Sequence, residues 1–310
     1  MPKTRNPEDY IVPLNINGLD GRMLHLPAKN KKTTSEILFV YGHHSSLERW
    51  WGVMLVLNRY AAVTMPDLPG FGGMDSFYTI GKKPSIDNLA DYLAAFIKLR
   101  YKRKKIIIAG MSVGFVIATR MLQKYPELTK KVTLLVSLVG FAHQDDFLFS
   151  RTRYYGYLLG SKILTRRVPA VLFRHVFLNP TLLRAVYAKG ENSKHKFALA
   201  EDQEEFDQLM QIEIGLWHNN DVRTWAYTTI EMLKLDNCKQ RVDLPIWHVA
   251  AKNDHFFDNH LVEQHMRVIF KGFKLATIDL KAHAPSVIAD EKMAEPLIPK
   301  KLQKVLASLK

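Results

Sequence analysis

The sequence predicts an α/β fold in which a mostly parallel central sheet is flanked by helices and a helical segment is inserted after the sixth strand. Two observations support this prediction. Short apolar runs, such as 104–111 and 131–140, alternate with segments of helical period, and strands that are apolar throughout are typical of parallel sheets covered on both faces. The alternation stops over residues 142–236, where the pattern is helical and aromatic-rich, and resumes afterwards.

The first part of the chain contains six predicted strands separated by turns or helices. The first two flank the turn GLDG and form a predicted hairpin, and the fourth runs into the Pro/Gly loop DLPGFGG. The six segments are 11–17, 22–28, 36–42, 61–73, 104–111 and 131–140. Predicted helices lie at 47–60, 85–101 and 113–128. Ser85 can cap the second helix, whose apolar residues recur on one face.

The last part of the chain returns to the same alternation. Its predicted elements are a strand at 244–254, a helix at 259–270, a strand at 273–280 and a helix at 299–310. The simplest interpretation is a core domain made of residues 1–141 and 237–310, interrupted by a helical cap at 142–236.

The composition is that of an ordinary globular protein: 310 residues, 47% hydrophobic and 24% charged. No apolar run approaches the roughly 18 residues of a membrane span, and residues 1–18 have no apolar core typical of a secretory signal. The single cysteine, Cys238, excludes an internal disulfide framework and predicts a reducing, cytoplasmic environment. No pattern predicts a metal site or a phosphate-binding loop, so we expect neither metal nor cofactor.

The net charge of +14 is the unusual feature of the composition. Residues 147–200 contain ten Lys or Arg and one acid, Glu191, and the basic residues interleave with aromatic and aliphatic ones. Either the cations face water, or the cap makes weak contact with an anionic membrane surface. We expect no nucleic-acid partner, because no recognised binding module accompanies the charge.

The segment KKIIIAGMSVGF, residues 104–115, places Ser112 between Gly110 and Gly114, with a strand before it and a helix after it. A serine hydroxyl is a weak nucleophile that needs a histidine to accept its proton and a carboxylate to orient that histidine. Flanking glycines relieve crowding in the strained strand-to-helix turn that projects such a serine. Ser112 is therefore a candidate nucleophile.

Two candidate partners follow later strands. Asp254 ends the strand at 244–254 and His283 comes just after the strand at 273–280, at the strand ends where α/β proteins place their sites. Asp258, Asp145 and Asp146 are alternative acids. We expect the other histidines near these segments, namely His43, His44, His255 and His260, to be loop or surface residues.

Five short motifs occur along the chain, each at a predicted strand end; in order they are FVYGHHSS, DLPGFG, GMSVG, AAKND and AHAPS. Together they resemble the α/β-hydrolase fold superfamily, in particular its serine-nucleophile members with a helical cap. The resemblance covers nearly the whole chain. It implies an oxyanion hole formed by the backbone N–H groups of Val113 and His43. Tyr41 stands where these members usually have histidine, a departure that a backbone donor tolerates.

A serine at this turn implies attack on an acyl carbon, whereas the dehalogenases and epoxide hydrolases of this superfamily use an aspartate there. We therefore expect a serine hydrolase that cleaves a carboxylic ester or related acyl bond of a small molecule through an acyl-enzyme. Two alternatives stay open at this point: a C–C bond or amide hydrolase with the same triad, and a non-catalytic ligand-binding member of the fold.

Overall fold

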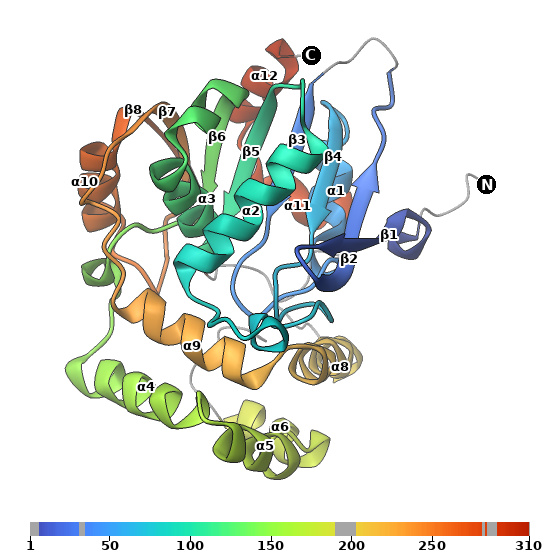
Figure 1. Ribbon diagram of the computed structural model, residues 1–310, viewed down its shortest axis with the longest axis vertical. Helices are drawn as coiled ribbons and strands as arrows, with labels where there is room; N and C mark the ends of the chain where they lie inside the picture. The colour runs from blue at the N-terminus through green and yellow to red at the C-terminus, as the bar shows by residue number, and fades with distance from the viewer. Residues whose placement is uncertain (1–5, 31–34, 190–202, 281–282, 284–289, 310) are drawn as a thin grey trace.

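The computed structural model describes residues 6–30, 35–189, 203–280, 283 and 290–309, and its centre is an eight-stranded sheet (Figure 1). In the order of the sheet, the strands are β1 (Ile11–Ile16), β2 (Leu19–Leu26), β4 (Ala62–Pro66), β3 (Glu36–Val40), β5 (Ile106–Met111), β6 (Val132–Leu138), β7 (Val242–Ala251) and β8 (Phe270–Ile278). The pairs β1–β2 and β2–β4 are antiparallel and all other pairs are parallel. The predicted α/β class and all predicted strands are confirmed.

Helices cover both faces of this sheet. In Figure 1, α2 (Ile86–Arg100) and α3 (Val113–Lys124) cross the front, while α1 (Trp51–Leu57), α11 (Glu291–Ala294) and α12 (Lys300–Ser308) lie behind. Ser85 caps α2 as predicted, because its side chain accepts the N–H of Asn88. Helix α10 (Asn259–Ile269) passes directly into β8, so that strand begins three residues before the predicted position. The predicted helix at 47–60 is shorter, since Glu48–Trp50 forms a 3₁₀ turn ahead of α1.

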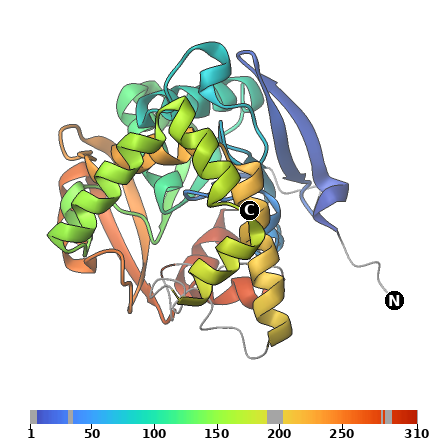
Figure 2. The same ribbon diagram turned by 90° about the horizontal axis from the view of Figure 1, so that it is seen from below.

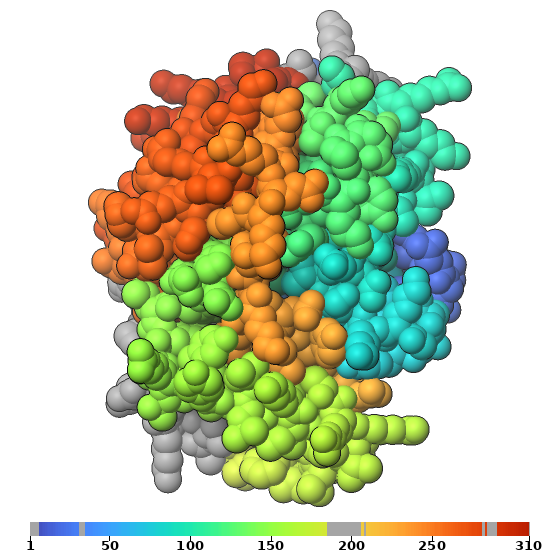
Figure 3. Space-filling view, turned by 60° about the vertical axis from the view of Figure 1, so that its left-hand side comes forward, coloured from blue at the N-terminus to red at the C-terminus, as the bar shows by residue number. Residues whose placement is uncertain are grey.

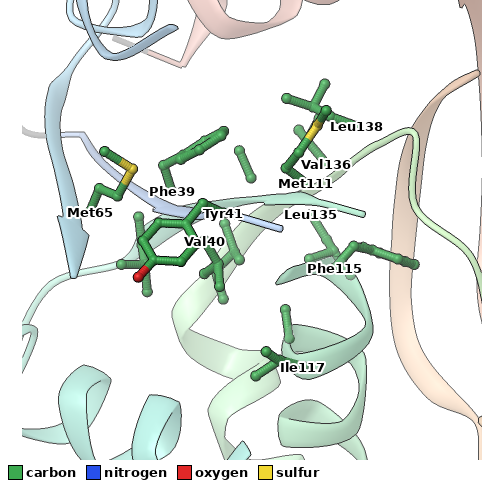
Figure 4. Close-up of a cluster of buried hydrophobic side chains, with 14 of the residues drawn as sticks. Phe39, Val40, Tyr41, Met65, Met111, Phe115, Ile117, Leu135, Val136 and Leu138 are labelled. Carbon is green, nitrogen blue, oxygen red and sulfur yellow. The ribbon is translucent and has the colours of Figure 1, made fainter. Parts of the chain in front are cut away.

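The core of the molecule lies between the sheet and these helices. Every residue of β3 and β5 is buried, as expected of central parallel strands. In Figure 4, Phe39 of β3, Met111 of β5 and Leu138 of β6 lie on one side of the strands, while Val40 of β3 and Phe115 of α3 lie on the other side, where the helix packs. The isoleucines that precede Ser112 therefore form the middle of the sheet and hold the end of β5 in place.

Residues between β6 and β7 form a separate group of helices at the lower end of the molecule in Figure 1, and the view from below in Figure 2 shows them nearest the reader. They are α4 (Arg151–Leu164), α5 (Arg167–Val176), α6 (Pro180–Lys189), α8 (Gln203–Asn219) and α9 (Val222–Leu233). They contain a second hydrophobic cluster, which includes Ala170, Met210 and Val222. Their division from the core at 142 and 236 stays a prediction.

None of the helices in the described part of the chain combines the length and the apolar character that a membrane span requires.

Two glycines let α3 approach the sheet closely. A Cβ atom added at Gly114 would lie 2.2 Å from the carbonyl oxygen of Val40 and 2.4 Å from that of Tyr41. One added at Gly110 would lie 2.5 Å from the Cα atom of Phe115. Since backbone atoms cannot move aside as a flexible side chain can, any larger residue must push α3 away from the end of β3.

We predict that Gly114→Ala lowers the free energy of unfolding by about 1–3 kcal/mol, because the new methyl group overpacks against the β3 backbone. Gly160→Ala is the matched control: Gly160 lies in α4 with nothing within 4 Å of its added Cβ. That substitution should raise the free energy by about 0.5–1 kcal/mol, the usual gain of alanine over glycine inside a helix. Urea unfolding of both variants tests the contrast, and equal stability of the two would contradict it.

Candidate active site

Ser112 occupies a strained turn between β5 and α3. Its φ of 49° and ψ of −118° are unusual for a residue with a side chain, and such backbone conformations cost roughly 1–3 kcal/mol. The turn is held by the N–H of Ser112, which donates to Leu138 O at 2.9 Å, and by its carbonyl, which accepts the N–H of Phe115 at 3.0 Å. The strand-to-helix context predicted from the sequence is thus present.

The structure brings Ser112, His283 and Asp254 together in one line of hydrogen bonds. The Nε2 atom of His283 lies 3.1 Å from Ser112 Oγ, and its Nδ1 atom lies 2.6 Å from Asp254 Oδ2. With Nδ1 bonded to a carboxylate, the ring carries its proton there and leaves Nε2 free to accept one from the serine. The three residues follow the carboxyl ends of β5, β7 and β8, and these ends lie on the same side of the parallel sheet.

Burial and hydrogen bonding together set the charge of the Asp254 carboxylate. The Asp254 and His283 side chains are only 3% and 13% exposed. Burial raises the pKa of Asp254, but the hydrogen bond and charge of His283 and the N–H groups of Phe256 and Phe257 outweigh it, so the pKa lies below its ordinary value. Asp254 is therefore ionised at neutral pH and can stabilise a positive charge on the imidazole.

The three alternative acids have other partners. Asp258 caps α10 by accepting the N–H groups of His260 and Leu261. Asp146 is fully buried, bonds to His265 Nδ1 at 2.6 Å and accepts two backbone N–H groups. Asp145 lies on the exposed side of the same turn, 3.5 Å from a nitrogen of His143. Among the candidates, Asp254 is the acid that contacts His283.

The loop after β3 lies directly against the Ser112 turn. A Cβ atom added at Gly42 would be 3.4 Å from both Ser112 Cβ and Met111 O. No hydrogen bond between described residues uses the N–H of His43 or that of Val113, the first residue of α3. Tyr41 points away into the core, where its hydroxyl donates to Asp67 at 3.0 Å and accepts the N–H of Leu68 at 2.7 Å.

A cavity of about 250 Å³ lies beside Ser112 and His283. Most of its wall is aromatic, and six of these residues come from the segments around α4 and from the loop after β7. They are Phe141, Phe147, Phe149, Tyr157, Phe256 and Phe257. The remaining apolar lining residues are Trp50, Met111 and three residues of α9, namely Trp225, Met232 and Leu233. Arg49 also lines the cavity, where its guanidinium donates to the carbonyl of His44 at 3.2 Å.

Two of the histidines that we expected to be loop or surface residues lie in a loop but are enclosed. His43 and His44 do lie in a loop, but His43 borders the cavity, and its Nε2 atom is 2.8 Å from the Thr228 hydroxyl. The ring of His44 is buried against Trp217. Helices α8 and α9 therefore cover the loop, which the loop sequence alone does not reveal. No cluster of three or more potential metal ligands occurs in the described parts of the chain.

The chain is similar to known proteins over most of its length. A family model described as the alpha/beta hydrolase fold matches residues 37–267. The pimeloyl-[acyl-carrier protein] methyl ester esterase of Wigglesworthia glossinidia brevipalpis is 27% identical over 111 residues, which make up 36% of this chain and 39% of that protein. The similarity to this curated relative thus spans about two fifths of its length.

Two solved structures share the arrangement of elements. A thermophilic esterase from Thermogutta terrifontis superposes with a TM-score of 0.64 at 15% identity, covering 96% of this chain and 98% of its own. The enol-lactonase from Burkholderia xenovorans LB400 gives 0.65 at 12% identity, with 96% and 99% covered. At these identities the likeness concerns the fold.

A second serine–histidine pair lies inside the sheet and away from the cavity. Ser137 of β6 and His248 of β7 are 0% and 1% exposed, and Ser137 Oγ is 2.9 Å from His248 Nδ1. Neither residue lines the cavity. Burial lowers the pKa of His248 from 6.5 to about 4, so the ring is neutral at neutral pH.

This pair generates a prediction for stability. Above pH 6.5 His248 is neutral in both states, but between pH 6.5 and about 4 the unfolded chain binds a proton that the folded chain does not. In this range His248 should therefore lower the free energy of unfolding by about 1.4 kcal/mol for each pH unit of acidification. In His248→Gln the slope should flatten by that amount, whereas the exposed His260→Gln control should keep the wild-type slope. Urea unfolding at several pH values measures both slopes, and an unchanged slope in His248→Gln contradicts the prediction.

Proposed function

The chain belongs to the alpha/beta hydrolase fold family, and on that premise we propose that it is a serine hydrolase that cleaves a carboxylic ester or a related acyl bond. The observation that carries the proposal is the unbroken line of hydrogen bonds from Ser112 through His283 to Asp254, which ends beside an apolar cavity. Asp254 is ionised, and each of the three groups has the neighbour that acyl transfer to serine requires.

The proposed reaction has two steps. Ser112 Oγ attacks the acyl carbon while His283 Nε2 takes its proton, and that proton then goes to the departing alcohol as the bond from the acyl carbon to its oxygen breaks. Water next attacks the acyl-serine, and His283 accepts its proton and returns one to Ser112 Oγ as the acid leaves. Asp254 stabilises the positively charged ring in both steps.

The oxyanion of each tetrahedral intermediate is assigned to the backbone N–H groups of His43 and Val113. The proximity of Gly42 to Ser112 supports this assignment, as does the position of Val113 at the start of α3, where the helix dipole favours negative charge. Removal of one such donor typically costs about 3–4 kcal/mol of transition-state stabilisation.

An ester is the favoured substrate class within acyl transfer. The aromatic cavity wall suits an apolar acyl group, and Ser112 and His283 are among its few polar groups. The curated relative is named for hydrolysis of a methyl ester, and the two solved neighbours are an esterase and an enol-lactonase. We also propose a cytoplasmic location, for which the single cysteine is the support.

We predict that Ser112→Ala lowers kcat for p-nitrophenyl butyrate by about 10⁴- to 10⁶-fold, as removal of the nucleophile does in enzymes that use such a triad. Ser137→Ala is the matched control, because it also removes a serine bonded to a histidine but one outside the cavity. That variant should retain most of the wild-type kcat.

A fluorophosphonate probe tests the same serine without knowledge of the natural substrate. The wild-type protein and Ser137→Ala should be labelled at Ser112, and Ser112→Ala should not be labelled. If the folded wild-type protein neither hydrolyses esters nor reacts with the probe, the chain is a ligand-binding protein of this fold and the proposed function is wrong.

The cavity gives a further prediction about chain length. Met232→Trp adds bulk to the wall formed by α9, so kcat/KM should fall more for p-nitrophenyl hexanoate than for the acetate. Tyr227→Trp, on the same helix but outside the lining, is the control and should leave the ratio of the two values unchanged. If Met232→Trp lowers kcat/KM by the same factor for both esters, the acyl group does not lie against this wall and the prediction is wrong.

A further inference from the structure

Helices α4 and α5 present large apolar side chains to solvent. Val168 is 77% exposed and Leu172 is 60% exposed, although surface helices normally turn such residues toward the core. The exposed apolar residues of the two helices are Tyr155, Leu159, Ile163, Val168, Val171, Leu172 and Val176, here called the outer face. They recur three or four residues apart within each helix, so they form stripes and are not scattered.

The two helices are anchored to the rest of the molecule through their other sides. The Tyr154 hydroxyl donates to Leu233 O at 2.8 Å, and Arg223 Nε donates to Thr165 O at 3.1 Å. Ser161 and Ala170 are buried on the inner side. The outer face is therefore a fixed surface at the lower end of the molecule, where the space-filling view shows α4 and α5 in yellow-green (Figure 3).

Cations flank the outer face. Arg151 and Lys162 of α4, and Arg166 and Arg167 at the start of α5, are exposed. The sequence has no Asp or Glu from 147 to 189, so no acidic residue of these helices offsets them. Long basic side chains beside aliphatic ones can lay their methylene groups on an apolar phase while their charges reach phosphates above it.

We propose that the outer face docks on the surface of an anionic phospholipid bilayer, with the aliphatic residues at the level of the acyl chains and the cations on the lipid phosphates. Charge complementarity favours this partner, because the face combines a net positive charge with apolar side chains and the whole chain carries +14. An acidic protein would also attract the arginines. However, the stripes extend over two helices and consist mainly of Leu, Ile and Val, residues that are less typical of the central contacts in protein interfaces than Trp, Tyr and Arg.

Vesicle sedimentation tests the proposal with the full chain. The protein should bind vesicles of phosphatidylcholine mixed with phosphatidylglycerol at least tenfold more tightly than vesicles of phosphatidylcholine alone, and added salt should weaken the binding. The double variant Arg166→Gln/Arg167→Gln should weaken it about thirtyfold, since each cation near an anionic surface contributes about a fivefold factor. Leu172→Ser should weaken it about tenfold.

Matched controls lie elsewhere on the molecule. Lys102→Gln/Arg103→Gln removes the same charge from an exposed loop before β5, at the other end of that strand from Ser112. Leu99→Ser removes a leucine with 59% exposure, almost the same as that of Leu172. Both should bind vesicles within about threefold of wild type if the face, and not the net charge alone, makes the contact. Unchanged thermal midpoints show that the variants are folded.

Three outcomes would overturn the proposal: equal binding to neutral and anionic vesicles, equal losses in the face variants and their controls, or no binding at all. In the last case, saturable binding of a purified acidic acyl-carrier protein would assign the face to a protein partner. A dimer that Leu172→Ser dissociates would instead assign it to a second copy of the chain. Ser112→Ala should bind as wild type does, so the result is independent of the proposed function.

Discussion

The arrangement of the candidate site depends on how closely α3 approaches the ends of β3 and β5. Ser112 can hold its strained backbone only because the strands on either side of the turn are buried and because Gly114 lets the helix start against the carbonyls of Val40 and Tyr41. The same approach brings the loop at Gly42 close to Ser112, since a Cβ atom added at Gly42 would lie 3.4 Å from Ser112 Cβ. One steric requirement thus positions both the proposed nucleophile and the loop that would provide an oxyanion donor.

The parallel sheet then places residues from distant parts of the sequence side by side. The carboxyl ends of β5, β7 and β8 point to the same side of the sheet, and the loops that leave them carry Ser112, Asp254 and His283. Asp254 is fixed before it meets the histidine, because its other oxygen accepts two backbone N–H groups of its own loop. The imidazole is therefore oriented by a carboxylate that cannot turn away, which is the preorganisation that proton transfer needs.

These features differ in how far the sequence predicts them. The strands and Ser112 follow from local patterns, and Asp254 and His283 follow from their position after strands, because topology and not side-chain detail decides that position. The choice between Asp254 and Asp146 depends on which histidine is near, and His265 on α10 could not be foreseen as the partner of Asp146. Likewise, the enclosure of His43 depends on α9, which packs across a long separation in sequence. Tertiary contacts of this kind leave no periodic signal.

The segment between β6 and β7 has two surfaces with different chemistry. Tyr157 of α4 contributes to the cavity beside Ser112, while Tyr155 and Leu159 of the same helix face outward. A helix whose inner side already meets an aromatic wall gains nothing in folding from further aliphatic residues on its outer side. Their presence beside exposed cations, in a stretch that has no Asp or Glu from 147 to 189, therefore favours an explanation outside the fold. A bilayer surface provides one, and it would also bring an apolar ester close to the helices that line the cavity.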